Sequence, residues 1–192
     1  MEISELRPKY EELLKANFPK RYLDYSFNSF IARTPEQKEA RDAAFDYVDK
    51  FHCSNEGTSL VFCGNVGTGK THLACAIAQE IMCRGHEVHF IHGDEIIEKS
   101  GSAFLNIGNT TRFDFLVIDD LYISEQAERN YILRNAMLNF YNEGISFVLT
   151  ATHSMADLRA LLGLSGFDKL FENCGNIIQL HGRSYRTGIR QN

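Results

Sequence analysis

The sequence predicts an α/β fold in which a mostly parallel, five-stranded sheet is covered by helices on both faces. Apolar strand-like runs alternate with helical stretches through most of the chain, an order typical of parallel sheets. One strand-to-helix junction carries a complete glycine-rich phosphate-binding pattern at residues 64–71, and a later apolar strand ends in two carboxylates. Together these observations predict a three-layer α/β/α domain with a phosphate site at one edge of its sheet.

Composition narrows the class of protein. The 192 residues are 44% hydrophobic, enough for one core, and 20 basic against 25 acidic residues give a net charge of −5. Any nucleic-acid contact must therefore come from a local basic patch. No apolar run reaches transmembrane length and the N-terminus lacks signal-peptide features, so we expect a cytoplasmic protein without a membrane partner. The five cysteines include no C-x-x-C pair, and packing is a better explanation for them than metal or disulfide bonds.

Residues 1–54 are expected to form an N-terminal helical extension. Residues 3–16 are a charged, moderately amphipathic helix candidate. An aromatic stretch follows from Tyr22 to Phe30. We expect this extension to precede a single larger domain.

A second helix is predicted from Thr34 to about Phe51. Thr34 and Gln37 form a capping box, and Pro35 suits the first turn. We expect the helix to bury Ala40, Ala44, Phe45 and Val48.

Residues 55–192 are predicted to form one domain in which strands and helices alternate. Strands are expected at 58–63, 87–92, 113–119, 145–151 and 176–181. The loop and its helix are expected at 64–84, and further helical stretches at 94–105, 124–142 and 155–172. Gly85 and Gly144 are placed to end two of these helices.

The phosphate-binding loop reads Gly-Asn-Val-Gly-Thr-Gly-Lys-Thr, which matches G-x-x-x-x-G-K-[ST] in full. Its glycines let the backbone curl so that N–H groups point at one phosphate, while Lys70 reaches the β- and γ-phosphates and the Thr71 hydroxyl holds Mg²⁺. The predicted nucleotide-binding residues are Gly64, Asn65, Val66, Gly67, Thr68, Gly69, Lys70 and Thr71. The chain is therefore predicted to bind a nucleoside triphosphate.

The apolar strand from Phe113 ends in Asp119 and Asp120. The carboxyl ends of parallel strands meet at one edge, so both carboxylates should reach the same edge as the phosphate loop. Asp119 fits a second Mg²⁺ anchor acting through water, and Asp120 would polarise the attacking water. The strand between the loop and these carboxylates favours the ATPase branch of P-loop proteins over the kinase branch.

The ordered set of motifs resembles the DnaC/DnaI-type replicative helicase loaders and equally the IstB-type transposition ATPases. The resemblance rests on Gly-Thr-Gly-Lys-Thr-His-Leu-Ala at 67–74, Leu-Val-Ile-Asp-Asp-Leu at 116–121 and Ser-Tyr-Arg at 184–186, and it runs from about Phe18 to the end. It implies an AAA+ ATPase fold without a C-terminal helical lid. The implied ligands are ATP and Mg²⁺, and the implied partners are a replicative helicase, single-stranded DNA and further copies of the chain.

Carried over by position, the resemblance gives catalytic roles to Lys70, Asp120, Thr152 and Arg186. Thr152 falls at the sensor-1 position, where the family usually has Asn. Arg186 falls at the sensor-2 position, where a cation would contact the γ-phosphate.

Three departures from the family pattern lower the expected hydrolysis rate or alter the expected partners. Asp168-Lys169 stands where an Asp-Arg pair usually supplies an arginine finger, and a lysine lacks the planar fork that grips a phosphoryl group. The stretch from His92 to Phe113, where loaders carry helices for single-strand and filament contacts, is short. Only about seventeen residues precede Phe18, where loaders usually carry a helicase-binding region.

Three functions remain open from the sequence. The first is a DnaC-like ATPase acting in DNA replication, slow in isolation, with Arg183, Arg186 and Arg190 as the densest candidate DNA-binding cluster. The second is an IstB-like transposition ATPase. The third is an ATP-gated interaction or inhibitor module with little hydrolysis, which Lys169 favours and the intact Asp119-Asp120 pair opposes.

Overall fold

The computed structural model describes residues 13, 15–51, 58–98, 113–172, 174–182 and 184. Its strands are β1 (Ser59–Gly64), β2 (Val88–His92), β3 (Phe115–Leu121), β4 (Ser146–Ala151) and β5 (Cys174–Leu180). Its helices are the 3-10 turn η2 (Lys20–Tyr22), α2 (Pro35–Lys50), α3 (Lys70–Cys83), α4 (Gly93–Glu98), α6 (Ala127–Asn142) and α7 (Met155–Glu172). The alternating order confirms the α/β class.

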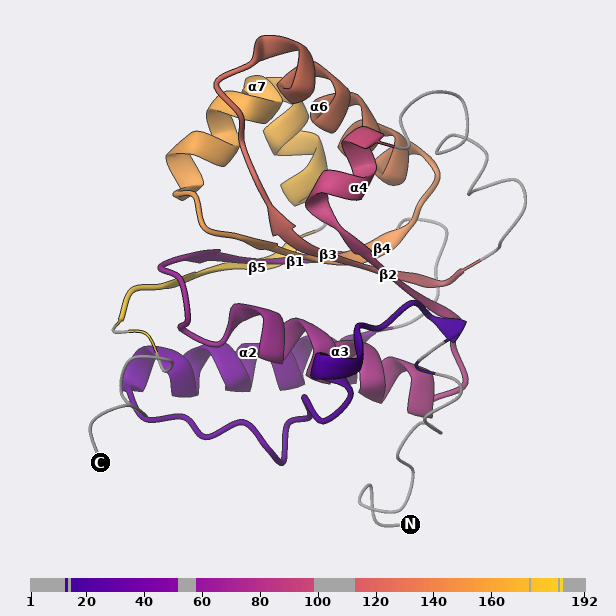
Figure 1. Cartoon of the computed structure of the whole chain (residues 1–192), viewed down its shortest axis with the longest axis vertical. Coiled ribbons are helices and arrows are strands. Elements are labelled where there is room, and N and C mark those ends of the chain that lie inside the picture. Colours follow the sequence, from indigo (N-terminus) through magenta and orange to yellow (C-terminus); the bar gives the residue numbers. More distant parts are fainter. Residues whose placement is uncertain are drawn as a thin grey trace.

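The five strands form one parallel sheet in the order β2-β3-β4-β1-β5. Helices α2 and α3 cover one face, and α4, α6 and α7 cover the other, so the molecule has the three layers predicted from the sequence (Figure 1). Strand β4 lies between β1, which leads into the phosphate loop, and β3, which carries the carboxylates. A side chain at the end of β4 therefore sits between the two motifs.

The sheet divides the core in two, because side chains alternate along each strand. In β1 every residue is buried: Leu60 and Phe62 join the core under α2 and α3, while Val61 and Cys63 join the core under α6 and α7. Such runs, apolar on both faces, are typical of a parallel strand in the middle of a layered fold.

Helix α2 begins as predicted with a capping box. The Thr34 hydroxyl accepts from the Gln37 backbone N–H at 3.3 Å, and the Gln37 side chain accepts from the Thr34 N–H at 3.2 Å. The expectation that Phe45 is buried is wrong: its side chain is 43% exposed. Position 45 lies at the edge of the buried stripe and its ring stacks on Phe27 at 4.0 Å, while Tyr47 takes the buried place.

The segment before α2 packs into the same core as α3 and β2. Phe18 and Tyr22 lie against Phe90 of β2, with ring centroids 5.2 and 5.8 Å apart, and the Phe90 N–H donates to the Ala16 carbonyl at 2.8 Å. The expected helix at 3–16 falls almost wholly outside the described residues. The boundary at residues 54/55 stays a prediction.

Element boundaries differ by a few residues from those expected. Helix α7 is interrupted at Gly163, whose backbone is not helical (φ +70°, ψ 166°), so it consists of two helical pieces. α4 ends at Glu98, and the rest of the stretch expected to reach residue 105 lies outside the described residues.

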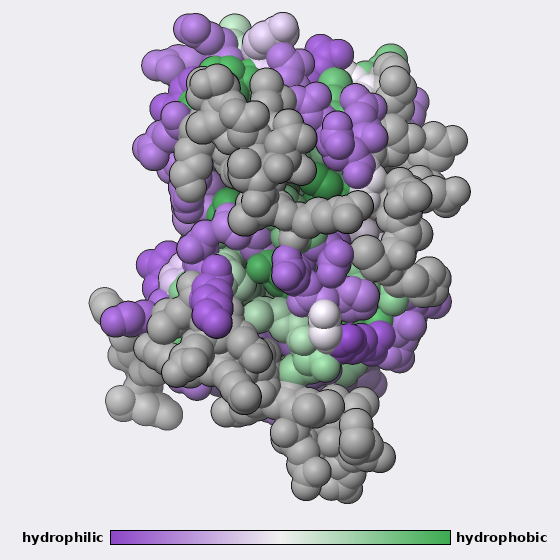
Figure 2. All heavy atoms as spheres, turned by 90° about the vertical axis from the view of Figure 1, so that its right-hand side faces the viewer, coloured by the Kyte–Doolittle hydropathy of each residue, from purple (hydrophilic) through white to green (hydrophobic). Residues whose placement is uncertain are grey.

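None of the helices in the described part of the chain has the length and apolarity to cross a membrane. Figure 2 shows the face beside β2, where hydrophilic side chains predominate among the described residues and apolar ones gather only in small patches.

Candidate functional site

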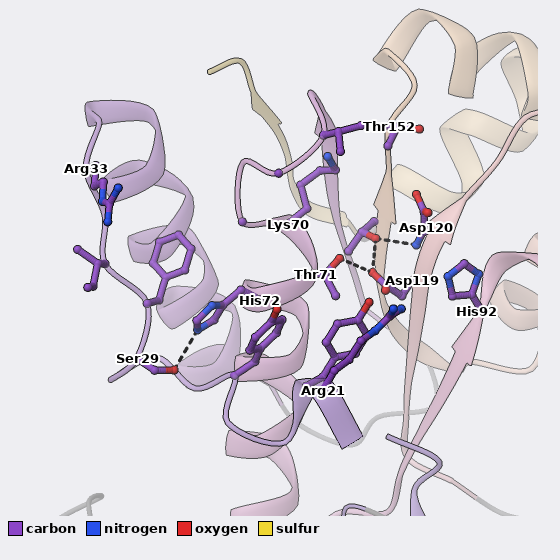
Figure 3. Close-up of a pocket in the computed structure, with 18 residues that line it drawn as sticks. Arg21, Ser29, Arg33, Lys70, Thr71, His72, His92, Asp119, Asp120 and Thr152 are labelled. Atoms are coloured by element: carbon purple, nitrogen blue, oxygen red, sulfur yellow. Dashed lines mark hydrogen bonds between the residues drawn. The ribbon is translucent and has the colours of Figure 1, made fainter. Parts of the chain in front are cut away.

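A cavity of about 580 Å³ opens at the carboxyl ends of β1, β3 and β4. Its volume is typical of sites for cofactors and other small molecules. The phosphate loop and the two carboxylates form one side, and side chains from the segment before α2 form the other (Figure 3). The two predicted motifs are therefore brought together in one site.

The phosphate loop needs glycine where it passes close to other segments, as Gly67 and Gly69 show. Gly67 has φ +75° and Gly69 has φ +106°, values that other residues rarely adopt. A Cβ on Gly67 would lie 2.1 Å from Ser184 Oγ, and one on Gly69 would lie 2.6 Å from a ring carbon of Phe30. The loop thus fits between the segment that contains Ser184 and the segment that contains Phe30. It leads into the N-terminus of helix α3, where backbone amides favour an anion.

Hydrogen bonds from outside the loop fix its conformation. The Asn65 N–H donates to the Leu180 carbonyl at 3.0 Å, and its side-chain amide donates to the Gly182 carbonyl at 3.3 Å. The Thr68 hydroxyl donates to the Asn65 carbonyl at 2.9 Å, and Gln37 reaches the Thr68 carbonyl at 3.4 Å. The loop is therefore held in place from both β5 and α2.

Lys70 is the first residue of α3 and extends back over the loop. Its ammonium donates to the carbonyl oxygens of Gly64 at 2.8 Å and Asn65 at 2.5 Å. The side chain is only 7% exposed. The cation is thus held inside the curl of the loop, where it can offset the charge of a phosphate.

Asp119 is a buried carboxylate, 1% exposed, that accepts two hydroxyl hydrogen bonds at one oxygen. Thr71 Oγ1 donates to Asp119 Oδ1 at 2.8 Å, and Thr150 Oγ1 donates to the same oxygen at 2.7 Å (Figure 3). Carboxylate and hydroxyl oxygens are the ligands that Mg²⁺ prefers, so this set fits the metal that the phosphate loop implies.

Asp120 follows on a bulge in β3, where the register against β4 shifts between Ile118 and Leu121. Its backbone is left-handed, with φ +56°, a conformation that Asp tolerates better than most residues. Its N–H donates to Thr150 Oγ1 at 2.8 Å. The bulge turns the Asp120 side chain outward to line the cavity, whereas Asp119 stays buried.

His72 joins the opposite wall of the cavity to the first turn of α3. Its ring stacks on Tyr25 at 4.5 Å, and meets Phe30 edge-on at 5.2 Å. Its Nε2 donates to the Ser26 carbonyl at 2.9 Å and lies 3.1 Å from Ser29 Oγ. Burial lowers the pKa of His72 below its ordinary value, so the ring is neutral near pH 7.

Tyr22 and Arg21 of η2 line the cavity near Asp119. Tyr22 is buried, and burial together with the negative charge of Asp119 raises its pKa to about 12, against an opposing effect of Arg21. The Arg21 guanidinium lies over the Tyr22 ring, 4.6 Å from its centroid.

Most of the predicted site residues line the cavity: Val66, Gly67, Gly69, Lys70, Thr71, Asp119 and Asp120. Gly64, Asn65 and Thr68 belong to the loop but do not line the cavity. Thr152 is exposed and also lines it. Arg183, Arg186 and Arg190 lie outside the described residues, as does the side chain of Lys169.

Sequence reasoning missed Thr150, His72, Tyr22 and Arg21. Thr150 carried a readable signal, since it is a hydroxyl inside the apolar strand 145–151 near the edge where Asp119 was expected. The other three carry no pattern of their own. Their place in the cavity depends on how the N-terminal segment packs against α3.

The chain is similar to two proteins of Escherichia coli over most of its length. It is 27% identical over 173 residues to the replicative helicase loader DnaC of Escherichia coli (strain K12), covering 85% of this chain and 70% of that protein. It is 23% identical over 176 residues to the uncharacterized protein YdaV of the same strain, covering 86% and 69%.

Solved structures share the fold. A crystal structure of the DnaC helicase loader matches with a TM-score of 0.70 and 22% identity over 85% of this chain and all of that one. DnaI matches with a TM-score of 0.70 and 17% identity over 87% and 93%. AMPPCP-bound DnaA from Aquifex aeolicus matches with a TM-score of 0.62 and 19% identity over 86% and 53%. The predicted AAA+ P-loop fold is confirmed.

The family model for IstB-like ATP binding protein matches residues 8–192, which span the N-terminal segment, the phosphate loop and the carboxylate strand. This match confirms the resemblance that the ordered motifs predicted. The chain therefore belongs to the IstB-like ATP-binding family, the group of AAA+ ATPases that includes the DnaC-type helicase loaders.

Proposed function

We propose that this chain is a Mg²⁺-dependent ATPase that acts as a DnaC-type helicase loader in DNA replication, assembling with a replicative helicase in a nucleotide-dependent way. The main support for the proposal is that the Thr71 and Thr150 hydroxyls both donate hydrogen bonds to the buried Asp119 carboxylate beside the phosphate loop. The similarity to DnaC over 85% of the chain supports the partner.

The cavity offers separate surfaces for the two ends of ATP. Lys70 and the loop amides are available to the phosphates, and the apolar side chains of Phe30, Ile31 and Val66 also line the cavity. Ile31 and Val66 are 63% and 60% exposed, so both are accessible to a flat apolar group. We assign this apolar part to the base of the nucleotide.

The residues around Asp119 support hydrolysis. Thr71 and, through water, Asp119 would hold Mg²⁺, which would offset the negative charge of the phosphates. Thr150 links the two acidic residues, because its hydroxyl donates to the Asp119 carboxylate and accepts from the Asp120 backbone N–H. The Asp120 carboxylate would polarise the attacking water and accept its proton as the water oxygen bonds to the γ-phosphorus and the bond from that phosphorus to ADP breaks. Thr152 and Arg186 would orient the γ-phosphate.

We expect the isolated chain to hydrolyse ATP slowly, because Lys169 occupies the position of the usual arginine finger. Such an arginine is worth about 10³–10⁵ in rate in other P-loop enzymes. The proposal also includes self-assembly and a cytoplasmic location. It further includes weak binding to single-stranded DNA through Arg183 and Arg190.

The test is recovery of partners from host lysate on the immobilised chain, with and without ATP, beside a Lys70→Ala control. ATP-dependent recovery of a replicative helicase by the wild type, and its loss in the control, is the expected result. Recovery of a transposase instead would show an IstB-like transposition ATPase. Recovery of neither, with no measurable ATP binding, would contradict the proposal.

A further inference from the structure

The 3-10 turn η2 carries a cation into the nucleotide cavity from the N-terminal side. Tyr22 is the anchor of this turn, since it is 5% exposed and packs on Tyr25 and Phe90 with centroids at 5.1 and 5.8 Å. The Arg21 guanidinium lies over the anchored Tyr22 ring, 4.6 Å from its centroid, and lines the cavity. A cation–π contact of this kind limits where the guanidinium can lie.

The Arg21 side chain points into the cavity. Figure 3 shows its side chain extending toward Asp119 and His92, on the side of Thr71 away from Lys70. Within the described part of the chain, no carboxylate forms an ion pair with it. The exposed guanidinium is thus able to meet a further anion in the cavity.

The segment that carries Arg21 is attached to the phosphate loop's own helix. His72, two residues after Lys70, bonds to the Ser26 carbonyl and stacks on Tyr25. Phe30 lies so close to Gly69 that a Cβ there would approach its ring to 2.6 Å. Arg21 therefore has a defined position relative to the phosphates that the loop would bind.

We propose that Arg21 contacts the γ-phosphate of ATP bound in this cavity, so that the N-terminal segment distinguishes ATP from ADP within a single chain. This inference rests on the proposed ATPase function. The loop amides would bind the inner phosphates and Lys70 would reach the β- and γ-phosphates, while Thr71 and Asp119, joined by a hydrogen bond, would hold the metal. Arg21 extends toward Asp119 in the cavity, and its planar guanidinium would bind two oxygens of the γ-phosphate there.

Lys169 stands in place of the usual arginine finger, so Arg21 would supply a guanidinium to the γ-phosphate that position 169 does not. An arginine supplied by the same chain serves the transferred phosphate in some other P-loop enzymes. Here the cation would come from a segment before the first strand. ATP, and not ADP, would then stabilise the contact between that segment and the loop.

The experiment is titration calorimetry of the full chain with ATP and with ADP, both with Mg²⁺, for wild type, Arg21→Gln, Arg21→Lys and a Lys20→Gln control. Lys20 is exposed on the same turn and does not line the cavity. Arg21→Gln should weaken ATP binding on the order of 10–100-fold and change ADP binding less than about twofold, since only one charged contact is lost. Arg21→Lys should retain part of the preference for ATP, and Lys20→Gln should behave as wild type.

The outcomes separate the inference from the function on which it rests. Equal weakening of ATP and ADP binding in both Arg21 variants would show that Arg21 only supports packing, and it would overturn the inference. Unchanged ATP binding in Arg21→Gln would overturn it as well. A wild-type chain that binds neither nucleotide would contradict the proposed ATPase function itself.

Discussion

Two regions enclose the nucleotide cavity, and they are held in position by different kinds of structure. The loop and carboxylate side is built from strand ends, so a short pattern at 64–71 and a pair of acids at the end of β3 place its groups. The N-terminal side, from η2 to Phe30, consists of one short 3-10 helix and turns, and it is positioned by contacts with His72, Phe90 and Gly69. The first side is specified by local sequence, and the second by packing. We therefore expect chemistry to depend mostly on the first and discrimination between nucleotides on the second.

The largest expected effect is on hydrolysis, at Asp120. Asp120→Asn keeps a residue that tolerates the left-handed backbone but cannot accept the proton from water. Turnover of ATP should fall about 10²–10⁴-fold with ATP affinity nearly unchanged, as measured by phosphate release and calorimetry. Asp46→Asn, on the exposed face of α2, is the matched control. Normal turnover in Asp120→Asn would remove this residue from the catalytic role.

The next effect is on affinity, at Lys70. Lys70→Ala removes the cation held in the curl of the loop, so ATP binding should weaken on the order of 100-fold. Lys38→Ala, on the exposed face of α2, serves as the control. Calorimetry measures both variants, and thermal melting shows whether each still folds. Equal ATP affinity in wild type and Lys70→Ala would contradict the assignment of the loop.

Thr150 should affect stability as well as turnover. Thr150→Val keeps the shape of the side chain but removes the donor to Asp119 and the acceptor of the Asp120 N–H. Stability should fall by about 1–3 kcal/mol because a buried carboxylate and an amide lose partners, and turnover should fall with it. Urea unfolding compares it with Thr150→Ser, which keeps the hydroxyl, and with the exposed Thr152→Val. An equal loss in the Thr152 variant would show that the hydroxyl network is not the cause.

The smallest expected effect is at His72 of α3, which contacts the N-terminal side, and it depends on pH. Burial lowers its folded pKa below the ordinary value of 6.5, so below about pH 6.5 the unfolded chain binds a proton that the folded chain does not. Stability should therefore fall as the pH drops from 6.5 toward the lowered folded pKa, and His72→Asn should lose this part of the fall. Melting temperatures at pH 7.5, 6.5 and 5.5 measure it, with His181→Asn, at an exposed histidine, as the control. The same slope in wild type and His72→Asn would rule His72 out as the group that titrates.

The contrast between the two regions also explains what the sequence could predict. The sheet, the capping box at Thr34 and the meeting of Lys70, Thr71 and Asp119 follow from periodicity and motifs that act over a few residues. Phe45 was wrongly expected to be buried, because the sequence of α2 fits equally well a buried face that includes position 45 and one that stops before it. Arg21 and His72 could not be placed, because their positions depend on a segment without regular structure folding back across α3.

The central claim is that both regions enclose one ATP molecule. Hydrogen–deuterium exchange of the full chain with and without Mg²⁺ and ATP tests it directly. The account predicts slower exchange at 64–71 and also at 20–33, with ADP protecting the loop but protecting 20–33 less. Protection confined to the loop, or protection of neither segment, would contradict it.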